Sequence, residues 1–348
     1  MTKRKKISFF DAKQYDRDFF DRENEKHDYE IIYHEEKLNA KTAVFAAGSD
    51  AVCAFVNDDI GEDTIQALLN QGIEILAMRC AGYNNIDFKS AYGKLHVVRV
   101  PTYSPYAVAE HAMALLLTLN RKLHKAYNRT RDFNFSLAGL TGMDLHNKTV
   151  GVIGTGKIGQ CFIHICRGFG MEILAYDPYP NKSLEVMYVS LEELLAKSDV
   201  ISLHCPLSEQ NYHIIDEVAI DQMKDGAYLI NTSRGALVDS NALLQGLLSS
   251  KIGGAGLDVY EEEADMFYED NSHTIVQDEI LSRLLTLPNV LLTSHQAFLT
   301  EEALSEIART TLNNLDAYYL GQPLENEICY RCNQNPADCT HQKNGRCF

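Results

Sequence analysis

Three residues with the chemistry of an acid, a base and an anion binder stand at the ends of predicted strands: Arg234, Glu263 and His295. Arginine suits an organic carboxylate because its guanidinium offers a two-pronged donor set and stays charged at any relevant pH. Histidine is well suited to donate a proton near neutrality, as an alkoxide requires after a hydride reaches a ketone carbon. A carboxylate bonded to the second ring nitrogen would orient the imidazole and favour its charged form. The three residue types together favour the reduction of a 2-oxo acid.

Each of these residues also has an ordinary structural interpretation. An arginine at a strand end is more often a surface ion-pair partner, and an isolated histidine is more often a core residue. The acidic run of Glu261, Glu262 and Glu263 is typical of a solvated face, and charge alone does not choose among them. The catalytic interpretation is favoured because the arginine, the acidic run and the histidine follow strands of one predicted nucleotide-binding sheet.

The elements that would position these residues form a series of alternating strands and helices. Apolar runs predict six strands, at 149–154, 172–176, 200–204, 228–232, 256–259 and 290–293. Helices are predicted among the connections, at 158–167, 191–196 and 240–248. This alternation is typical of a doubly wound parallel sheet, in which ligands bind at the carboxyl ends of the strands.

The sequence GTGKIG at 154–159 fits the glycine-rich motif of dinucleotide-binding proteins. It follows a predicted strand and enters a predicted helix, whose first amide groups could bind a pyrophosphate. An acid that ends the next strand, 18 residues after the last glycine, would bind ribose hydroxyls and repel a 2′-phosphate, which favours NAD over NADP. The alternative is a glycine turn in another α/β protein. The cofactor-binding residues expected from this pattern are Gly154, Gly156, Lys157, Ile158, Gly159 and Asp177.

The first hundred residues show the same rhythm of strands and helices. Strands are predicted at 43–46, 51–56, 73–78 and 96–100, and a helix at 64–71. A long apolar helix opens at Ser104, and another is predicted over 300–320. If this last helix packs on the first hundred residues, the first domain is discontinuous. We therefore expect three parts, a substrate domain (1–103 plus 299–328), an NAD-binding Rossmann domain (104–298) and a Cys-rich tail (329–348).

Over residues 7–328 the chain resembles the D-isomer-specific 2-hydroxyacid dehydrogenases, and among them the fermentative D-lactate dehydrogenases. The resemblance rests on five motifs, GTGKIG at 154–159, HCPL at 204–207, NTSRG at 231–235, GLDVYE at 256–261 and SHQAFLT at 294–300. It implies an α/β fold of two Rossmann-like or flavodoxin-like doubly wound domains with a cleft between them. It also implies reduction of pyruvate to D-lactate with NADH. The alternatives are a D-2-hydroxyacid dehydrogenase for a bulkier acid, such as 2-oxoisocaproate or phenylpyruvate, and an NAD-sensing corepressor-type binding protein.

The resemblance also implies a role for individual residues. The family's catalytic arginine, glutamate and proton-donating histidine fall on Arg234, Glu263 and His295, the glutamate being the fifth residue after Asp258. Further cofactor contacts are implied at Cys205, Pro206, Asn211, Thr232, Ser233, Arg234 and Asp258, the last of these bonding the nicotinamide carboxamide. Substrate contacts are implied at Ala81, Gly82, Tyr83, Tyr103, Arg234, His295 and Phe298. For Tyr103 and Phe298 the alternative is a ring that only fills space.

The amino-acid composition excludes some classes of binding partner and indicates where in the cell the protein is expected. With 32 basic and 48 acidic residues, the formal net charge of −16 disfavours non-specific binding to nucleic acid or to anionic membranes. No run approaches the roughly 20 apolar residues of a membrane span. The basic segment 1–6 lacks the apolar core of a signal peptide, so we expect a cytoplasmic protein. The resemblance implies a homodimer or higher homo-oligomer that acts on a small 2-oxo or 2-hydroxy acid.

Four of the nine cysteines fall in the last twenty residues: Cys329, Cys332, Cys339 and Cys347. With the histidine at 341 they form the pattern C-x2-C-x6-C-x-H-x5-C, which could supply the four ligands of a tetrahedral zinc ion. A reducing cytoplasm disfavours structural disulfides. The alternative is a flexible, redox-sensitive or unligated tail, and the family resemblance does not extend to this segment.

Overall fold

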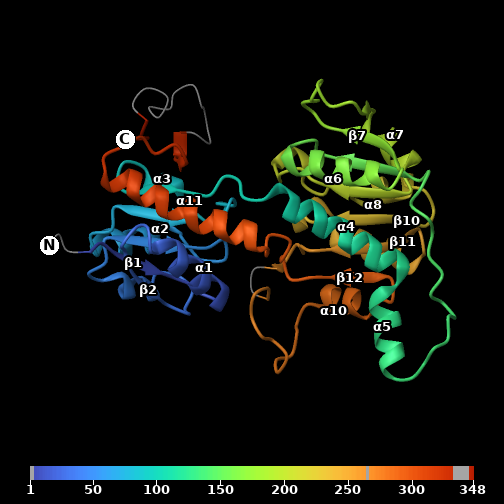
Figure 1. Cartoon of the computed structure of the whole chain (residues 1–348), viewed down its shortest axis with the longest axis horizontal. Coiled ribbons are helices and arrows are strands. Elements are labelled where there is room, and N and C mark those ends of the chain that lie inside the picture. Colours follow the sequence, from blue (N-terminus) through green and yellow to red (C-terminus); the bar gives the residue numbers. More distant parts are fainter. Residues whose placement is uncertain (1–3, 264–265, 332–344) are drawn as a thin grey trace. The chain divides into compact units, whose positions relative to one another are not determined.

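The structure is a computed structural model that describes residues 4–263, 266–331 and 345–348 (Figure 1). The chain divides into two compact units. The first combines Met1–Ser104 with Thr300–Phe348, so it is built from both ends of the chain, and the second is the continuous segment Pro105–Leu299. Each unit contains one sheet, and the candidate catalytic residues all belong to the second.

The first unit is built on a six-stranded sheet with the order β13-β5-β4-β3-β1-β2. Its strands are β1 (Lys6–Phe9), β2 (Glu30–Tyr33), β3 (Ala51–Ala54), β4 (Ile75–Met78), β5 (His96–Val98) and β13 (Glu327–Ile328). The helices are α1 (Gln14–Asn24), α2 (Glu62–Asn70), α3 (Phe88–Ala91) and α11 (Glu301–Tyr319), with a 3-10 helix η1 (Thr42–Ala46). The central strands β3 and β4 are buried along their whole length, as expected for a parallel sheet covered on both faces.

The second unit is built on a seven-stranded parallel sheet with the order β12-β11-β10-β9-β6-β7-β8. Its strands are β6 (Thr149–Ile153), β7 (Glu172–Tyr176), β8 (Met187–Tyr188), β9 (Val200–Leu203), β10 (Ala227–Asn231), β11 (Ile252–Leu257) and β12 (Val290–Leu292). The helices are α4 (Pro105–Arg121), α5 (Leu123–Arg131), α6 (Lys157–Gly168), α7 (Leu191–Lys197), α8 (Glu217–Gln222), α9 (Ser240–Leu248) and α10 (Glu279–Thr286). Two 3-10 helices, η2 (Glu209–Asn211) and η3 (Gly235–Leu237), lie in the connections.

Many of the helices begin at a residue whose side chain accepts a hydrogen bond from a backbone N–H of the first turn. This holds for α7, α8, α9, α10 and α11, which are capped by Ser190, Asp216, Asp239, Asp278 and Thr300. Short polar side chains at this position stabilise a helix because the first amide groups have no partner within the helix. The residues at which these helices begin are therefore encoded in the local sequence.

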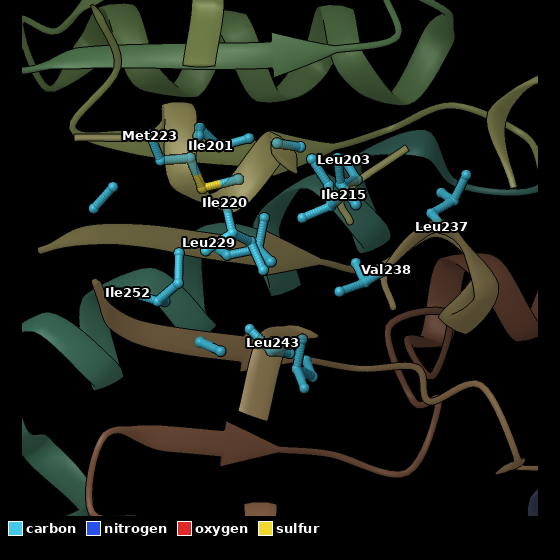
Figure 2. Packing of buried hydrophobic residues seen from close by; sticks show 14 of the residues in the cluster. Ile201, Leu203, Ile215, Ile220, Met223, Leu229, Leu237, Val238, Leu243 and Ile252 are labelled. Atoms are coloured by element: carbon cyan, nitrogen blue, oxygen red, sulfur yellow. The ribbon is translucent and has the colours of Figure 1, made fainter. Parts of the chain in front are cut away.

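The core of the second unit consists of apolar residues on both faces of its sheet. Figure 2 shows one cluster, in which Ile201 and Leu203 of β9 and Leu229 of β10 pack with residues of the helices α8 and α9. In a second cluster, apolar residues of α4 and α6 pack together, among them Met113 and Phe162. The central strands of this sheet are continuous apolar runs in the sequence, which is why the sequence predicts them well.

The structure confirms a mixed α/β fold with parallel sheets, but it corrects one predicted strand. Residues 43–46 form part of the 3-10 helix η1. Ala43 and Ala46 are buried while Val44 and Phe45 are about half exposed, and this spacing of three is that of a helical turn. Four strands were not among the predicted ranges: β1, β2, β8 and the antiparallel β13. Of these, β8 and β13 have only two residues each and therefore no readable periodicity.

No helix within the described residues is both long and apolar enough to cross a membrane. The longest, α11, has 19 residues and carries Glu301 and Glu302 in its first turn. The cytoplasmic location expected from the sequence stays a prediction.

Candidate active site

The expected site residues of the second unit lie at the carboxyl ends of neighbouring strands. The strands β12, β11, β10, β9, β6 and β7 are adjacent in this order and parallel. They are followed by His295, Asp258, Arg234, Cys205, Gly154 and Asp177 respectively. Since the carboxyl ends of parallel strands share one edge of the sheet, the fold gathers these side chains along that edge.

His295 and Glu263 form a hydrogen-bonded pair. The imidazole Nδ1 lies 2.7 Å from Glu263 Oε1, and each side chain is about one-fifth exposed. Glu263 is itself held, because its Oε2 accepts a hydrogen bond of 2.9 Å from the backbone N–H of Tyr260. With Nδ1 engaged, Nε2 is the ring nitrogen that can donate a proton to a ligand. The geometry thus supplies the carboxylate–imidazole pair that the chemistry requires.

The structure also distinguishes the three consecutive glutamates. Glu261 points to a different cluster, where its Oε1 lies 2.7 Å from Nε2 of His213 and accepts a hydrogen bond from Tyr212. Glu262 is exposed. Only Glu263 of the three has a hydrogen bond to His295 within the described part of the chain.

Arg234 follows β10 at the start of η3 and is partly buried. Its Nη1 donates to the carbonyl oxygen of Ser233 at 2.7 Å, and no carboxylate of the described residues pairs with it. The next residue, Gly235, lies against the loop that carries Glu263, because a Cβ atom there would come within 2.1 Å of the carbonyl of Tyr260. The glycine of NTSRG therefore lets the arginine loop and the glutamate loop lie side by side.

The three glycines of the motif at 154–159 have different surroundings. Gly154 has a φ of +94°, and a Cβ atom there would lie 2.7 Å from the backbone carbonyl of His204. Gly156 precedes α6 and faces open space, with no atom within 4 Å of an added Cβ. Gly159 packs so closely that a Cβ atom would lie 2.1 Å from the carbonyl oxygen of Gly154. This is the cradle that the pyrophosphate of a dinucleotide needs at a helix N-terminus.

Asp177 lies beside this loop and is bound to it. Its Oδ2 accepts hydrogen bonds from the backbone N–H and the hydroxyl of Thr155, at 2.7 and 2.8 Å, and its Oδ1 accepts one from Tyr179 N. Burial raises the pKa of the Asp177 carboxyl, but the hydrogen bonds from Thr155 and Tyr179 lower it more, so the group is an anion. A fixed negative charge at this place fits the ribose hydroxyls of NAD and disfavours a 2′-phosphate. Lys157, at the first position of α6, is exposed, and Ile158 is partly buried.

The remaining cofactor candidates line the ends of β9 and β10. Asn211 folds back on its own loop and donates to the carbonyl of Pro206 at 2.7 Å. Burial raises the pKa of the Cys205 thiol to about 11, so it is a neutral group. The hydroxyl of Ser233 donates to a carbonyl of β9. Thr232 is buried, and its hydroxyl has no hydrogen-bond partner in the described residues, so it presents an unsatisfied polar atom that a bound cofactor could satisfy.

The substrate candidates of the first unit lie on the loop that follows β4. Arg99 holds this loop, since its Nη1 donates to the carbonyl of Ala81 at 2.8 Å and its guanidinium lies 4.8 Å from the ring centre of Tyr83. The carbonyl of Gly82 accepts a hydrogen bond from the thiol of Cys80. The loop is thus fixed within its own unit, and its contact with substrate stays a prediction.

The two aromatic substrate candidates lie, in sequence, close to the boundaries between the two units. Tyr103 is partly buried in the first unit, and Phe298 is buried in the second. Their expected contacts with substrate stay predictions.

Comparison with known proteins decides the family. The sequence model described as "D-isomer specific 2-hydroxyacid dehydrogenase, NAD binding domain" matches residues 113–297. A D-lactate dehydrogenase of Escherichia coli K12 is 50% identical over 327 residues, which cover 93% of this chain and 99% of that protein. The chain belongs to the D-isomer-specific 2-hydroxyacid dehydrogenases. It is an NAD-dependent oxidoreductase, which confirms the enzyme interpretation over that of an NAD-sensing binding protein.

Solved structures of this dehydrogenase family are similar along almost the whole chain. A structure of the pyruvate reductase of Chlamydomonas reinhardtii has a TM-score of 0.89 at 42% identity, and the match covers 93% of this chain and 98% of that chain. A D-2-hydroxyisocaproate dehydrogenase has a TM-score of 0.82 at 36% identity, covering 93% and 99%. Both likenesses support the two-domain architecture of the family.

Three side chains around the dehydrogenase site were not found from the sequence. The hydroxyl of Tyr268 donates to the carbonyl oxygen of His295 at 3.0 Å. His111 and Thr293 lie next to Asp258, at 3.3 and 2.5 Å from its Oδ1. Nothing in the sequence indicates a role for Tyr268. His111 could have been noticed, because it lies on the same helix face as the residues at 115 and 119, which are buried leucines. A polar residue in line with buried leucines is unusual and indicates a specific partner.

The cysteine tail of the dehydrogenase is only partly described. Cys332 and Cys339 lie outside the described residues. Cys329 and Cys347 are buried, at 4% and 1% exposure, in one small cluster against which Tyr92 packs. Within the described residues, no group of three or more His, Cys, Asp or Glu side chains could hold a metal ion.

Proposed function

We propose that the enzyme reduces pyruvate to D-lactate with NADH and catalyses the reverse reaction. The observation that carries the proposal is the 2.7 Å contact between His295 and Glu263 on the sheet edge that also holds Arg234 and the glycine loop. The names of similar proteins point the same way, since they include D-lactate dehydrogenases and a pyruvate reductase.

The roles of the residues follow from their chemistry. Arg234 binds the carboxylate of the 2-oxo acid through two N–H donors, which fixes the carbonyl carbon in place. Bound NADH supplies the hydride. As charge develops on the carbonyl oxygen, His295 donates its Nε2 proton to that oxygen. Glu263 keeps the imidazole oriented through its hydrogen bond to Nδ1, so that Nε2 faces the ligand.

A panel of four 2-oxo acids tests the substrate. We expect kcat/KM to be highest for pyruvate when NADH absorbance is followed with pyruvate, 2-oxoisocaproate, phenylpyruvate and hydroxypyruvate. Chiral analysis of the product should find D-lactate. A higher kcat/KM for 2-oxoisocaproate or phenylpyruvate would favour the bulkier-acid alternative, and formation of L-lactate would overturn the stereochemical part of the proposal.

Glu263→Gln should slow pyruvate reduction by about tenfold to 10²-fold. The carboxylate holds the imidazole Nδ1 at 2.7 Å, and the neutral amide would hold it less strongly, so the proton donor would lose its fixed position. The measurement is kcat/KM for pyruvate. Glu262→Gln, at the exposed neighbouring position, is the matched control, and a wild-type rate in Glu263→Gln contradicts the pairing.

We also propose that the dehydrogenase forms a homodimer through the segment 123–137. This segment of the second unit exposes several large apolar side chains, with Tyr127 61%, Phe133 84%, Phe135 71% and Leu137 81% exposed. Several large exposed apolar side chains in one short segment favour a site that binds another protein. A second copy of the chain is the partner implied by the family resemblance.

The double substitution Phe133→Ser/Phe135→Ser should convert the dimer into a monomer. The reason is that it removes two large apolar side chains of the proposed interface while leaving the buried core intact. Light scattering coupled to size-exclusion chromatography measures the mass, with Tyr179→Ser, which changes an exposed tyrosine elsewhere in the unit, as the control. A wild-type mass near 39 kDa, or an unchanged dimer in the double variant, contradicts the proposal.

The tail supports a third proposal, a site for zinc or a similar thiophilic metal. Cys329 and Cys347 lie 18 residues apart in sequence and share one buried cluster. The end of the chain is firmly held, since Cys347 N donates to a Glu327 carboxylate oxygen at 2.6 Å and Arg346 donates to two carbonyls at the end of α11. Two buried cysteines of one cluster thus support a shared site.

Metal analysis of the full-length protein tests this site. We expect about one zinc per chain in protein purified without chelators, since four ligands hold one ion. The double substitution Cys329→Ser/Cys347→Ser should lose the metal, whereas Cys161→Ser, at a partly buried cysteine of α6, should retain it. Metal-free wild-type protein, or equal zinc in the double variant, contradicts the proposal.

A further inference from the structure

The backbone at residues 295–297 is hydrogen-bonded to Asp258. Three consecutive amides donate to this residue: His295 N to its carbonyl oxygen at 2.7 Å, Gln296 N to Oδ1 at 2.9 Å and Ala297 N to Oδ2 at 2.8 Å. His295 has a φ of +53°, in the left-handed region that residues other than glycine rarely adopt. Such a conformation persists only where its surroundings hold it. Asp258 therefore holds the backbone at and directly after the expected proton donor.

Two of these three hydrogen bonds go to the carboxylate of Asp258, which accepts both of them as long as it stays charged. The residue has no exposed surface. Burial raises the pKa of its carboxyl, but hydrogen bonds from His111, Thr293 and Ala297 lower it more, so that the pKa lies below its usual range. A buried carboxylate without such donors would be costly. Of these donors, only His111 can also bring a positive charge.

The hydrogen-bond directions around Asp258 assign the proton of His111. The hydroxyl of Thr293 has one proton, and the 2.5 Å contact with Asp258 Oδ1 uses it. The Thr293 oxygen then accepts from His111 Nε2 at 3.1 Å. The same Nε2 lies 3.3 Å from Asp258 Oδ1. His111 is thus an Nε2–H donor that binds both members of the pair.

The sequence places His111 there by the way α4 packs on β11. A Cβ atom at Gly256 would lie 3.1 Å from the Cβ of Leu115, and one at Gly254 would lie 3.1 Å from a methyl group of Leu119. The two glycines therefore let the helix lie directly on the strand. His111, Leu115 and Leu119 are spaced by four residues and share one helix face. The face that packs on the glycines thus brings His111 to the carboxyl end of the strand, where Asp258 follows.

We propose that His111 is a positioning residue for the proton transfer. It acts through Thr293 and Asp258, whose carboxylate accepts the amides of Gln296 and Ala297 and so fixes the turn that directly follows His295. His111 itself does not meet the reacting atoms. The inference rests on the proposed function, because it takes His295 to be the proton donor.

Kinetics of two variants at position 111 test this role. His111→Ala should slow the single-turnover oxidation of NADH by pyruvate by about tenfold to 10²-fold, since small displacements of a catalytic group have effects of this size. The NADH dissociation constant, measured by fluorescence, should stay within about threefold of the wild-type value because the glycine loop is untouched. His111→Gln should recover most of the rate, because its amide can still donate to Thr293 and Asp258.

A double-mutant cycle shows whether His111 acts through Thr293. His111→Ala and Thr293→Val should each slow the single turnover, and the double variant should be no slower than the slower single one, because residues that act as a unit are non-additive. His164→Ala, at an exposed position of α6, is the matched control and should leave the rate unchanged.

The outcomes separate this inference from the proposed function. Wild-type turnover in His111→Ala, additive losses in the double variant, or an NADH affinity that falls as much as the rate would each overturn the positioning role. If His295→Ala in the same assay loses its activity while His111→Ala does not, only this inference fails. If His295→Ala is also fully active, the proposed function fails with it.

Discussion

His295→Ala should reduce the rate of pyruvate reduction by about 10²–10⁴-fold, the usual contribution of a positioned general acid. The imidazole is held by Glu263 at Nδ1, so its Nε2 is the donor available to the carbonyl oxygen. Water would have to supply the proton in the variant, from no fixed position. Stopped-flow measurement of NADH oxidation at saturating pyruvate gives the rate of the chemical step directly.

The binding of NADH should be unaffected by this substitution, because the glycine loop and Asp177 lie on other strands. His164→Ala serves again as the control for the loss of a surface imidazole. Near-normal turnover of His295→Ala would refute the role of this residue. A loss of NADH affinity equal to the loss of rate would show that the imidazole binds the cofactor and does not donate the proton.

Arg234→Gln should lower kcat/KM for pyruvate by about 10²–10³-fold, since removing one partner of a desolvated charge pair costs about 2–5 kcal/mol. The guanidinium donates only to the carbonyl of Ser233 among the described residues, so most of its donors are available to a substrate carboxylate. Arg234→Lys should recover part of the loss, because the charge returns without the two-pronged geometry. Initial rates over a range of pyruvate concentrations give the constant.

The matched control is Arg309→Gln, which removes an exposed arginine that pairs with Glu306 on α11. Its kcat/KM should equal that of the wild type. The sequence resemblance also implies that Arg234 contacts the cofactor. If Arg234→Gln weakened NADH binding and left the KM for pyruvate unchanged, Arg234 would be a cofactor ligand and the substrate carboxylate would need another partner.

The partner of His295 could be predicted from the sequence only in part. Charge and position could not separate it from Glu261 and Glu262, and only the resemblance to a family selected it. The structure separates the three by geometry, because Glu263 bonds to His295 while Glu261 bonds to His213. Which carboxylate faces which imidazole depends on the path of a loop, and a loop's path is not encoded in the order of three identical residues.

The predicted strand at 43–46 failed for a related reason. Four apolar residues in a row are compatible with a buried strand or with a turn of helix, and so short a run does not show its period. The structure buries Ala43 and Ala46 and exposes Val44 and Phe45, which fixes the helical alternative. Burial of a short element is decided by what packs on it.

The sequence by itself determined the features that depend on neighbouring residues. The glycine spacing at 154–159, the apolar runs of the parallel strands and the capping residues of the helices each act over one turn or one strand, so they can be read in order along the chain. Tertiary structure alone decided that His111 meets Thr293, 182 residues further on, and that Asp258 anchors the backbone at 295–297. Such contacts form because α4 lies on the glycines of β11, and the packing of one element on another has no local signal in the sequence.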